Sequence, residues 1–126
     1  MNNKWILVLA FTPCFAFAQT EYSSKIWQAD VAYEQQDYRK SIACYQAAFE
    51  IKEAEPIDLY NAACNYALIK DKKMALKYLK KAMKLGFSNY HYLYNDKDLY
   101  VLRHERKWKK LMRKYEVYDR LQIADN

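Results

Sequence analysis

The chain has 126 residues, of which 52% are hydrophobic, and it contains a single Gly and two Pro. This length holds one domain, and the scarcity of helix-breaking residues favours helices over a sheet. The formal net charge is +6, and a chain with one Gly excludes a Gly-rich phosphate-binding loop.

The first 18 residues have the pattern of a signal peptide. A short start with one basic residue, Lys4, precedes an almost wholly apolar run from Trp5 to Phe17, and Ala16 and Ala18 are the small residues expected before a cleavage site. The apolar run is short for a membrane span. We therefore expect export to the periplasm or cell envelope, with a helical domain over residues 19–126. An uncleaved membrane anchor is the alternative.

The middle of the chain contains one pattern twice, at a spacing of 34 residues, so that Ala29 aligns with Ala63 and Ala48 with Ala82. Each copy is predicted to form two helices, over 24–35 and 38–52 in the first copy and over 57–69 and 72–85 in the second. A helix pair repeated at this period is typical of proteins in which each unit buries its apolar face against a neighbour. We predict an all-α fold of tandem helix-turn-helix repeats over about 22–55 and 56–89. An ordinary four-helix bundle is the alternative.

The small and large packing residues of both copies resemble the tetratricopeptide repeat (TPR) family. The matching positions are Ala29, Asp37, Tyr38, Ser41, Tyr45 and Ala48 in the first copy and Ala63, Asp71, Ala75, Leu79 and Ala82 in the second. The sequence departs from the family at Lys72, where an aromatic residue is usual, and at Gln36 and Lys70, where Gly often marks the turn. We also expect Asp37 and Asp71 to cap the helices that follow them, because a carboxylate accepts bonds from unpaired backbone N–H groups.

A capping segment over residues 90–122 follows the second copy. We expect a short helical turn over 88–94, a turn over 95–98 and a long final helix over 104–122. The segment resembles the one that ends many bacterial TPR proteins, which implies that it caps the array. The inward stripe of the last helix is predicted to consist of Trp108, Leu111, Met112, Tyr115 and Tyr118.

The TPR resemblance also implies a concave groove, lined by the first helix of each repeat, that binds a peptide of another protein. The corresponding residues here are Ile26, Asp30, Tyr33, Tyr60, Asn61 and Cys64, and Tyr94 extends the set. This aromatic and mildly acidic set suits an apolar or basic segment of a partner, whose identity the sequence does not name. For each residue, an ordinary surface or core position is the alternative.

The last predicted helix carries a second candidate surface, which is basic. Its residues are Arg103, Arg106, Lys107, Lys110, Arg113 and Lys114. A solvated face without a partner is one interpretation, and attraction to an anionic membrane, polymer or acidic protein is another. Nucleic acid is the least favoured partner, since an exported protein rarely meets DNA. The alternative function is therefore a peripheral envelope protein that binds anionic material through this helix.

The sequence predicts no enzyme, metal site or cofactor. His91 and His104 have no partners at ligand spacing, and Asp96 and Asp98 lack the Gly and the distal Glu of a calcium loop, so we interpret both as helix caps. A disulfide between Cys44 and Cys64 is conceivable in an exported protein. We favour two separate buried thiols, because a disulfide needs Cα atoms within about 7 Å and suitably aimed.

Overall fold

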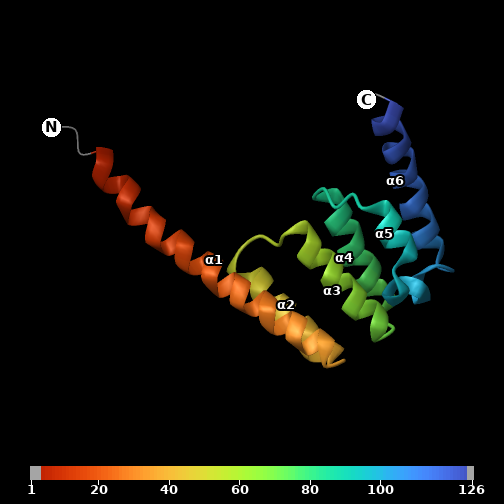
Figure 1. Ribbon diagram of the computed structural model, residues 1–126, viewed down its shortest axis with the longest axis horizontal. Helices are drawn as coiled ribbons and strands as arrows, with labels where there is room; N and C mark the ends of the chain where they lie inside the picture. The colour runs from red at the N-terminus through yellow and green to blue at the C-terminus, as the bar shows by residue number, and fades with distance from the viewer. Residues whose placement is uncertain (1–3, 125–126) are drawn as a thin grey trace. The chain divides into compact units, whose positions relative to one another are not determined.

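The computed structural model describes the backbone of residues 4–124 and the side chains of residues 14–116. Every regular element of that part of the chain is helical, as Figure 1 shows, which confirms the all-α class. In chain order the elements are α1 (Lys4–Glu34), α2 (Tyr38–Ile51), α3 (Pro56–Leu68), α4 (Lys72–Lys84), α5 (Tyr90–Asn95), the 3-10 helix η1 (Lys97–Leu102) and α6 (Arg106–Ala124). The chain divides into two compact units, Met1–Ala54 and Glu55–Asn126, and we describe each by itself.

The first unit is a hairpin of α1 and α2. Our prediction that the first helix begins near Ser24 is wrong, because α1 already begins at Lys4. The intervening residues include no Gly, and the helix continues through Pro13 to Ser24 and beyond. Buried packing within the described side chains of α1 begins at Tyr22 and continues at Ala29 and Ala32.

The predicted cleavage site after Ala18 lies within α1. The side chains around it contribute little to packing, since Phe15 is 74% exposed and Phe17 is 72% exposed. Removing residues 1–18 therefore takes no described buried side chain away from the hairpin. Within the described chain, no helix combines the length and the apolar character needed to cross a membrane.

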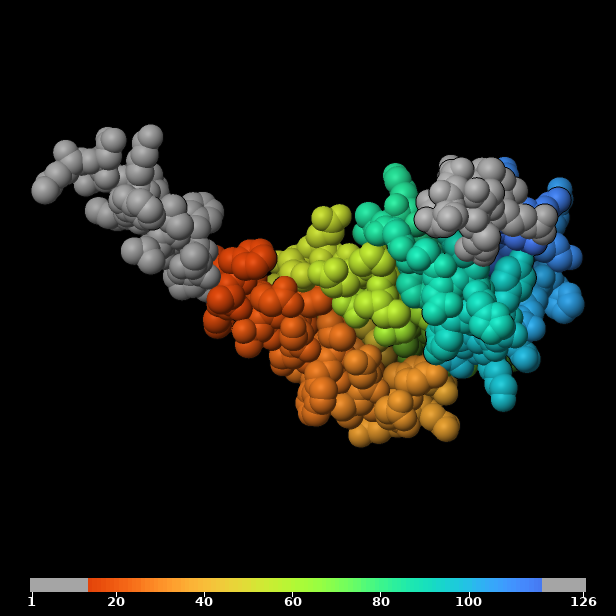
Figure 2. Space-filling view, turned by 45° about the horizontal axis from the view of Figure 1, so that its top comes forward, coloured from red at the N-terminus to blue at the C-terminus, as the bar shows by residue number. Residues whose placement is uncertain are grey.

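The second unit consists of the hairpin of α3 and α4 together with α5, η1 and α6. In Figure 2 the teal and cyan atoms of α5 and η1 lie against the green atoms of the hairpin. Its core includes fully buried leucines from each part except α6, namely Leu59, Leu79, Leu93, Leu99 and Leu102. From α6, Trp108 and Met112 are buried, as predicted, while Leu111 and Tyr115 are only half-buried and Tyr118 lies outside the described side chains.

One element of the capping segment was not predicted. We expected a turn over 95–98, but α5 extends to Asn95 and η1 begins at Lys97. The extra 3-10 turn places Leu99 and Leu102 three residues apart on one face, and both are fully buried. Burial of these two leucines stabilises a helical turn that the local sequence does not signal.

The turn between the two helices of each hairpin has the same geometry in both copies. Gln36 and Lys70 adopt the left-handed conformation, with φ of 60° and 63°. In both copies the next N–H, of Asp37 or Asp71, donates over 2.9 Å to the carbonyl five residues earlier, which closes the end of the first helix. Both turns therefore adopt a conformation that favours Gly without containing one.

The predicted caps are also confirmed in both copies. The Asp37 Oδ1 accepts a bond of 3.1 Å from the Lys40 N–H, and the Asp71 Oδ1 accepts one of 3.1 Å from the Met74 N–H. Each bond satisfies one of the donors that a helix N-terminus leaves unpaired. The 34-residue period is thus visible in the hydrogen bonds as well as in the sequence.

Small residues occupy the helix contacts inside each hairpin. Ala29 and Ala48 in the first copy, and Ala63 and Ala82 in the second, have no exposed surface. Side chains of this size let two helix backbones approach closely. Ser41 is also fully buried, but its Oγ has no hydrogen-bond partner among the described residues.

Candidate partner-binding site

A cluster of three side chains joins the α3 helix to the segment that follows it; we name it the Asp96 cluster, after its central residue. Tyr60 and Cys64 are four residues apart on α3, so they lie on the same face of the helix. Asp96 stands between α5 and η1, and its Oδ2 accepts hydrogen bonds from the Tyr60 hydroxyl and, over 3.6 Å, from the Cys64 thiol. Its Oδ1 accepts from the Asp98 N–H over 2.9 Å and so caps η1.

Aromatic rings enclose the Tyr60 side of this cluster. The Phe87 ring stacks on the Tyr60 ring with centroids 4.3 Å apart, and the Tyr92 ring is tilted against it at 5.9 Å. As a result, Tyr60 is only 1% exposed although it carries a polar hydroxyl. A buried hydroxyl is costly unless it is hydrogen-bonded, so the Asp96 carboxylate is important for this packing.

The environment keeps both donors of the cluster protonated. Burial is the main cause that raises the pKa of Tyr60 and of Cys64 above their ordinary values, and the Asp96 carboxylate adds to it. The charge of Asp96 also raises the pKa of Tyr92. Since a thiol reacts mainly as its thiolate, Cys64 is suited to donating a hydrogen bond rather than to nucleophilic chemistry.

The same place has three groups that could ligate a metal ion. Ligand atoms of Cys64, Asp96 and Asp98 lie within 4.8 Å of one another, and a thiol with carboxylates is a donor set that Zn²⁺ accepts. In this structure, however, both oxygens of Asp96 accept hydrogen bonds, Oδ2 from Tyr60 and Cys64 and Oδ1 from the Asp98 N–H. We therefore assign the cluster a structural role, as an anchor for η1. The prediction that Asp96 is a cap is confirmed, whereas Asp98 lies within the first turn of η1.

The predicted partner-binding residues of the second unit differ in how exposed they are, because two of them belong to the Asp96 cluster. Tyr60 and Cys64 are 1% and 4% exposed, so they offer almost no surface to a partner in this structure. Asn61 is half-buried, and its carbonyl accepts a bond of 3.0 Å from the Asn65 side chain. Tyr94 is 43% exposed and is the most accessible of the predicted partner-binding residues in this unit.

The predicted partner-binding residues of the first unit lie on α1. Ile26 and Tyr33 are half-buried, and Asp30 is exposed. The Asp30 Oδ1 accepts a hydrogen bond of 2.7 Å from the Tyr45 hydroxyl, which links α1 to α2. The Tyr33 ring is tilted against the Tyr38 ring at 5.9 Å. Asp30 thus has a structural contact, and its role toward a partner stays a prediction, as does that of Ile26 and Tyr33.

The three cysteines are free thiols in this structure. Cys14 is exposed on α1, Cys44 is half-buried on α2 and Cys64 is buried on α3. The disulfide that we considered between Cys44 and Cys64 is not formed here.

The predicted basic residues of the last helix are exposed, except for Arg103, which is half-buried in the turn before α6. The Arg103 guanidinium lies over the Tyr100 ring, 3.8 Å from its centroid, and donates a hydrogen bond to the Tyr94 carbonyl. These contacts hold Arg103 at the edge of an open hollow, which we name the basic depression. Its lining consists of Tyr94, Arg103, Trp108, Lys109, Met112 and Arg113.

The sequence analysis missed basic residues that lie next to this last helix. The α4 helix carries six lysines and no acidic residue, and all six are exposed. At the start of both helices, the Lys72 ammonium pairs with the Glu105 carboxylate over 2.7 Å. The sequence signals this surface, because residues 72–84 contain six lysines and no acidic residue.

Comparison of the chain with models of protein families, with curated proteins and with solved structures found no match. The functional interpretation is therefore based on the residues of this chain. Two surfaces of the second unit are accessible to a partner. One is the basic depression, and the other consists of the lysines of α4 with their neighbours on α6.

Proposed function

We propose that the protein is a binding module of the bacterial cell envelope, in which TPR-like repeats form a scaffold and another protein is the ligand. In this proposal the chain acts by binding and has no chemistry of its own. The basic depression of the second unit supports this proposal most strongly, because it combines an apolar floor with a cationic rim.

The side chains of the depression suit a particular kind of partner segment. Its floor is formed by Trp108 and Met112, which are 3% exposed, and its rim by Arg103, Lys109 and Arg113. Aromatic residues, Met and Arg are the types enriched in protein interfaces, and an Arg guanidinium can bind a carboxylate through two parallel hydrogen bonds. We therefore expect a segment with an apolar side chain beside an acidic one. This revises our expectation of an apolar or basic segment.

The two hairpins support the scaffold part of the proposal. Their turns have the same hydrogen bonds at a 34-residue spacing, and their helix contacts use the same small residues. Binding residues on capped, well-packed helices are held more precisely than residues on loops. In this view Ile26, Asp30 and Tyr33 supply a contact region on the first unit and Asn61 supplies a contact on the second, as the TPR resemblance implies.

The test is site-specific photo-crosslinking in envelope extract. A photoreactive phenylalanine analogue replaces Tyr94 at the depression and, in a matched control, replaces Trp27, which is 65% exposed on α1 and outside the predicted partner-binding set. The proposal predicts that the Tyr94 position links to one protein and that unlabelled full-length chain competes for this link. It also predicts that the Trp27 position does not give the same product.

Either of two results contradicts the proposal. One is a set of crosslinked proteins that is the same from Tyr94 and from Trp27, since contact would then be non-specific. The other is a Tyr94 product that persists after Arg113→Glu reverses a charge on the rim, because the depression would then not be the site of contact.

A further inference from the structure

We infer that α4 and α6 together form a basic face that docks the second unit on an anionic phospholipid surface. This face consists of Lys73, Lys77, Lys80 and Lys84 on α4 with Arg106, Lys107, Lys110 and Lys114 on α6. The inference goes beyond the proposed partner binding and does not depend on it.

The positive charge of the chain is concentrated in one unit. Of the 21 Lys and Arg residues, 16 lie in residues 55–126, but only nine of the 15 Asp and Glu residues do. The first unit is therefore close to neutral while the second is strongly basic. Such an asymmetry gives the second unit a long-range attraction to anions.

The charges on α4 are not neutralised by neighbours. Of the six lysines of α4, only Lys72 is paired with a carboxylate among the described residues, and the lysines of the basic face are not. The ammonium groups of these lysines are exposed to solvent, and like charges repel one another. A surface with this distribution gains energy when an extended anion approaches.

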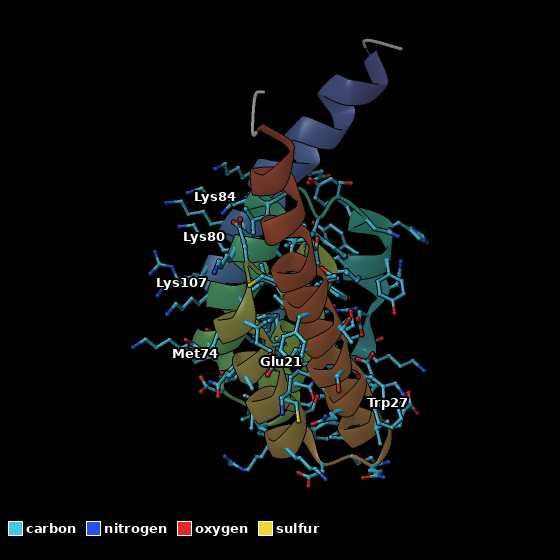
Figure 3. All side chains as sticks on the ribbon, turned by 90° about the vertical axis from the view of Figure 1, so that its left-hand side faces the viewer. Glu21, Trp27, Met74, Lys80, Lys84 and Lys107 are labelled. Atoms are coloured by element: carbon cyan, nitrogen blue, oxygen red, sulfur yellow. The ribbon has the colours of Figure 1, made fainter. Side chains whose placement is uncertain are left out.

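The two helices form one continuous face. α4 and α6 are in contact, and the Lys72–Glu105 pair joins their N-terminal ends. Figure 3 shows Lys80 and Lys84 of α4 on the same side of the unit as Lys107 of α6. Along α4, the row from Lys73 to Lys84 spans about 16 Å at the helical rise per residue.

The size of this face favours a membrane over a small anion. The row is longer than the screening length of about 8 Å at physiological ionic strength, so a partner must offer negative charge over a comparable area. A bilayer with anionic lipids does so, and lysines near such a surface contribute additively.

The residue types on the face and at its edge also favour lipid over nucleic acid. α4 uses only Lys, whereas sequence-reading contacts to DNA commonly use Arg. Ile57 and Leu85 are 50% and 37% exposed, and both lie at the end of the α3–α4 hairpin where α4 finishes. Exposed apolar side chains beside lysines are typical of surfaces that lie in a lipid interface.

The experiment measures binding of the full-length chain to vesicles. Phosphatidylcholine vesicles give the baseline, which includes any contribution from the apolar N-terminal residues, and vesicles with added phosphatidylglycerol give the charge-dependent part. We expect the anionic lipid to strengthen binding and salt to weaken it. Each lysine that contacts the surface is expected to contribute about fivefold in affinity.

Three variants locate the surface. Lys80→Ala with Lys84→Ala removes two charges from α4, and Lys107→Ala with Lys110→Ala removes two from α6. Arg39→Ala with Lys40→Ala is the control, which lowers the net charge equally but in the first unit. Both test pairs are expected to lose at least tenfold of the charge-dependent affinity, and the control is expected to lose little. Circular dichroism checks that each variant keeps its helices.

Several results would overturn the inference. Equal losses from the control and the test pairs would mean that net charge alone attracts the lipid. A loss from the α6 pair but none from the α4 pair would remove α4 from the surface. Tighter binding to a short DNA duplex than to anionic vesicles, at the same salt, would make nucleic acid the partner. Each of these results leaves the crosslinking test at Tyr94 unaffected, so the two proposals can fail separately.

Discussion

Replacing Asp96 by Ala tests whether the Asp96 cluster anchors η1 to α3. The change leaves the Tyr60 hydroxyl, on a side chain only 1% exposed, without its carboxylate partner. An unpaired buried donor costs about 1–3 kcal/mol, and loss of the cap on η1 adds about 1 kcal/mol. We therefore expect the free energy of unfolding to fall by about 2–4 kcal/mol. Urea unfolding followed by circular dichroism measures this change.

A matched control separates the anchor from simple capping. Asn89 caps α5 by accepting a bond of 3.0 Å from the Tyr92 N–H, and Asn89→Ala removes that cap without exposing a buried hydroxyl. This control is expected to cost about 1 kcal/mol. A double-mutant cycle of Asp96→Ala with Tyr60→Phe should give a coupling energy of about 1–3 kcal/mol.

Two outcomes would refute the anchor. One is a cost for Asp96→Ala no larger than that for Asn89→Ala, because the contact with Tyr60 would then contribute nothing. The other is additivity of Asp96→Ala and Tyr60→Phe within about 0.5 kcal/mol, which is the result for residues that do not interact.

Three further predictions concern stability. Gln36→Gly and Lys70→Gly should each stabilise the protein by about 0.5–1 kcal/mol in urea unfolding, because both residues have positive φ; a loss similar to that of Gly inside a helix would contradict this. Ser41→Ala should raise the free energy of unfolding by about 1 kcal/mol, since its buried Oγ has no partner, and Ala75→Ser at the equivalent position should lower it similarly; equal signs for the two would contradict the explanation. The folded state holds the Cys64 proton more tightly than the unfolded state, so the free energy of unfolding should fall as pH rises above the ordinary thiol pKa of 9.0. In the Cys64→Ala variant the free energy of unfolding, measured across this range, should fall less steeply with pH. Parallel curves for wild type and variant would contradict this.

The local features of the fold could be predicted from the sequence because short-range patterns determine them. The helices of the two hairpins, apart from the start of α1, end within a residue or so of their predicted limits. Asp37 and Asp71 cap them because a carboxylate at that position needs only a backbone N–H three residues later. The burial of Ala29 and Ala63 follows from their place in the repeat.

The burial of Tyr60 and Cys64 on α3 could not be predicted in the same way. It depends on a hydrogen bond between Tyr60 and Asp96, which are 36 residues apart, and on the 3-10 turn that presents Asp96. A pattern of residue types along the chain does not indicate which distant residue will cover a given face of a helix. For the same reason Tyr60 and Cys64 looked like groove residues in the sequence, although they are buried in the structure.

The basic depression was only partly predicted. Tyr94, Arg103 and Arg113 were among the expected site residues, but they were assigned to two separate surfaces. The structure brings them together because the Arg103 side chain bends back to the Tyr94 carbonyl. A tertiary contact of this kind has no signal in the local sequence.

The central claim is that the protein binds another protein through the basic depression. The most direct measurement is affinity capture from envelope extract at low and at physiological salt, with full-length wild type compared with Tyr94→Ala combined with Arg113→Glu. We expect mass spectrometry to identify a protein that wild type retains at both salt concentrations and the variant loses. If wild type and variant retain the same proteins, or if wild type retains no protein at either salt concentration, the claim is wrong.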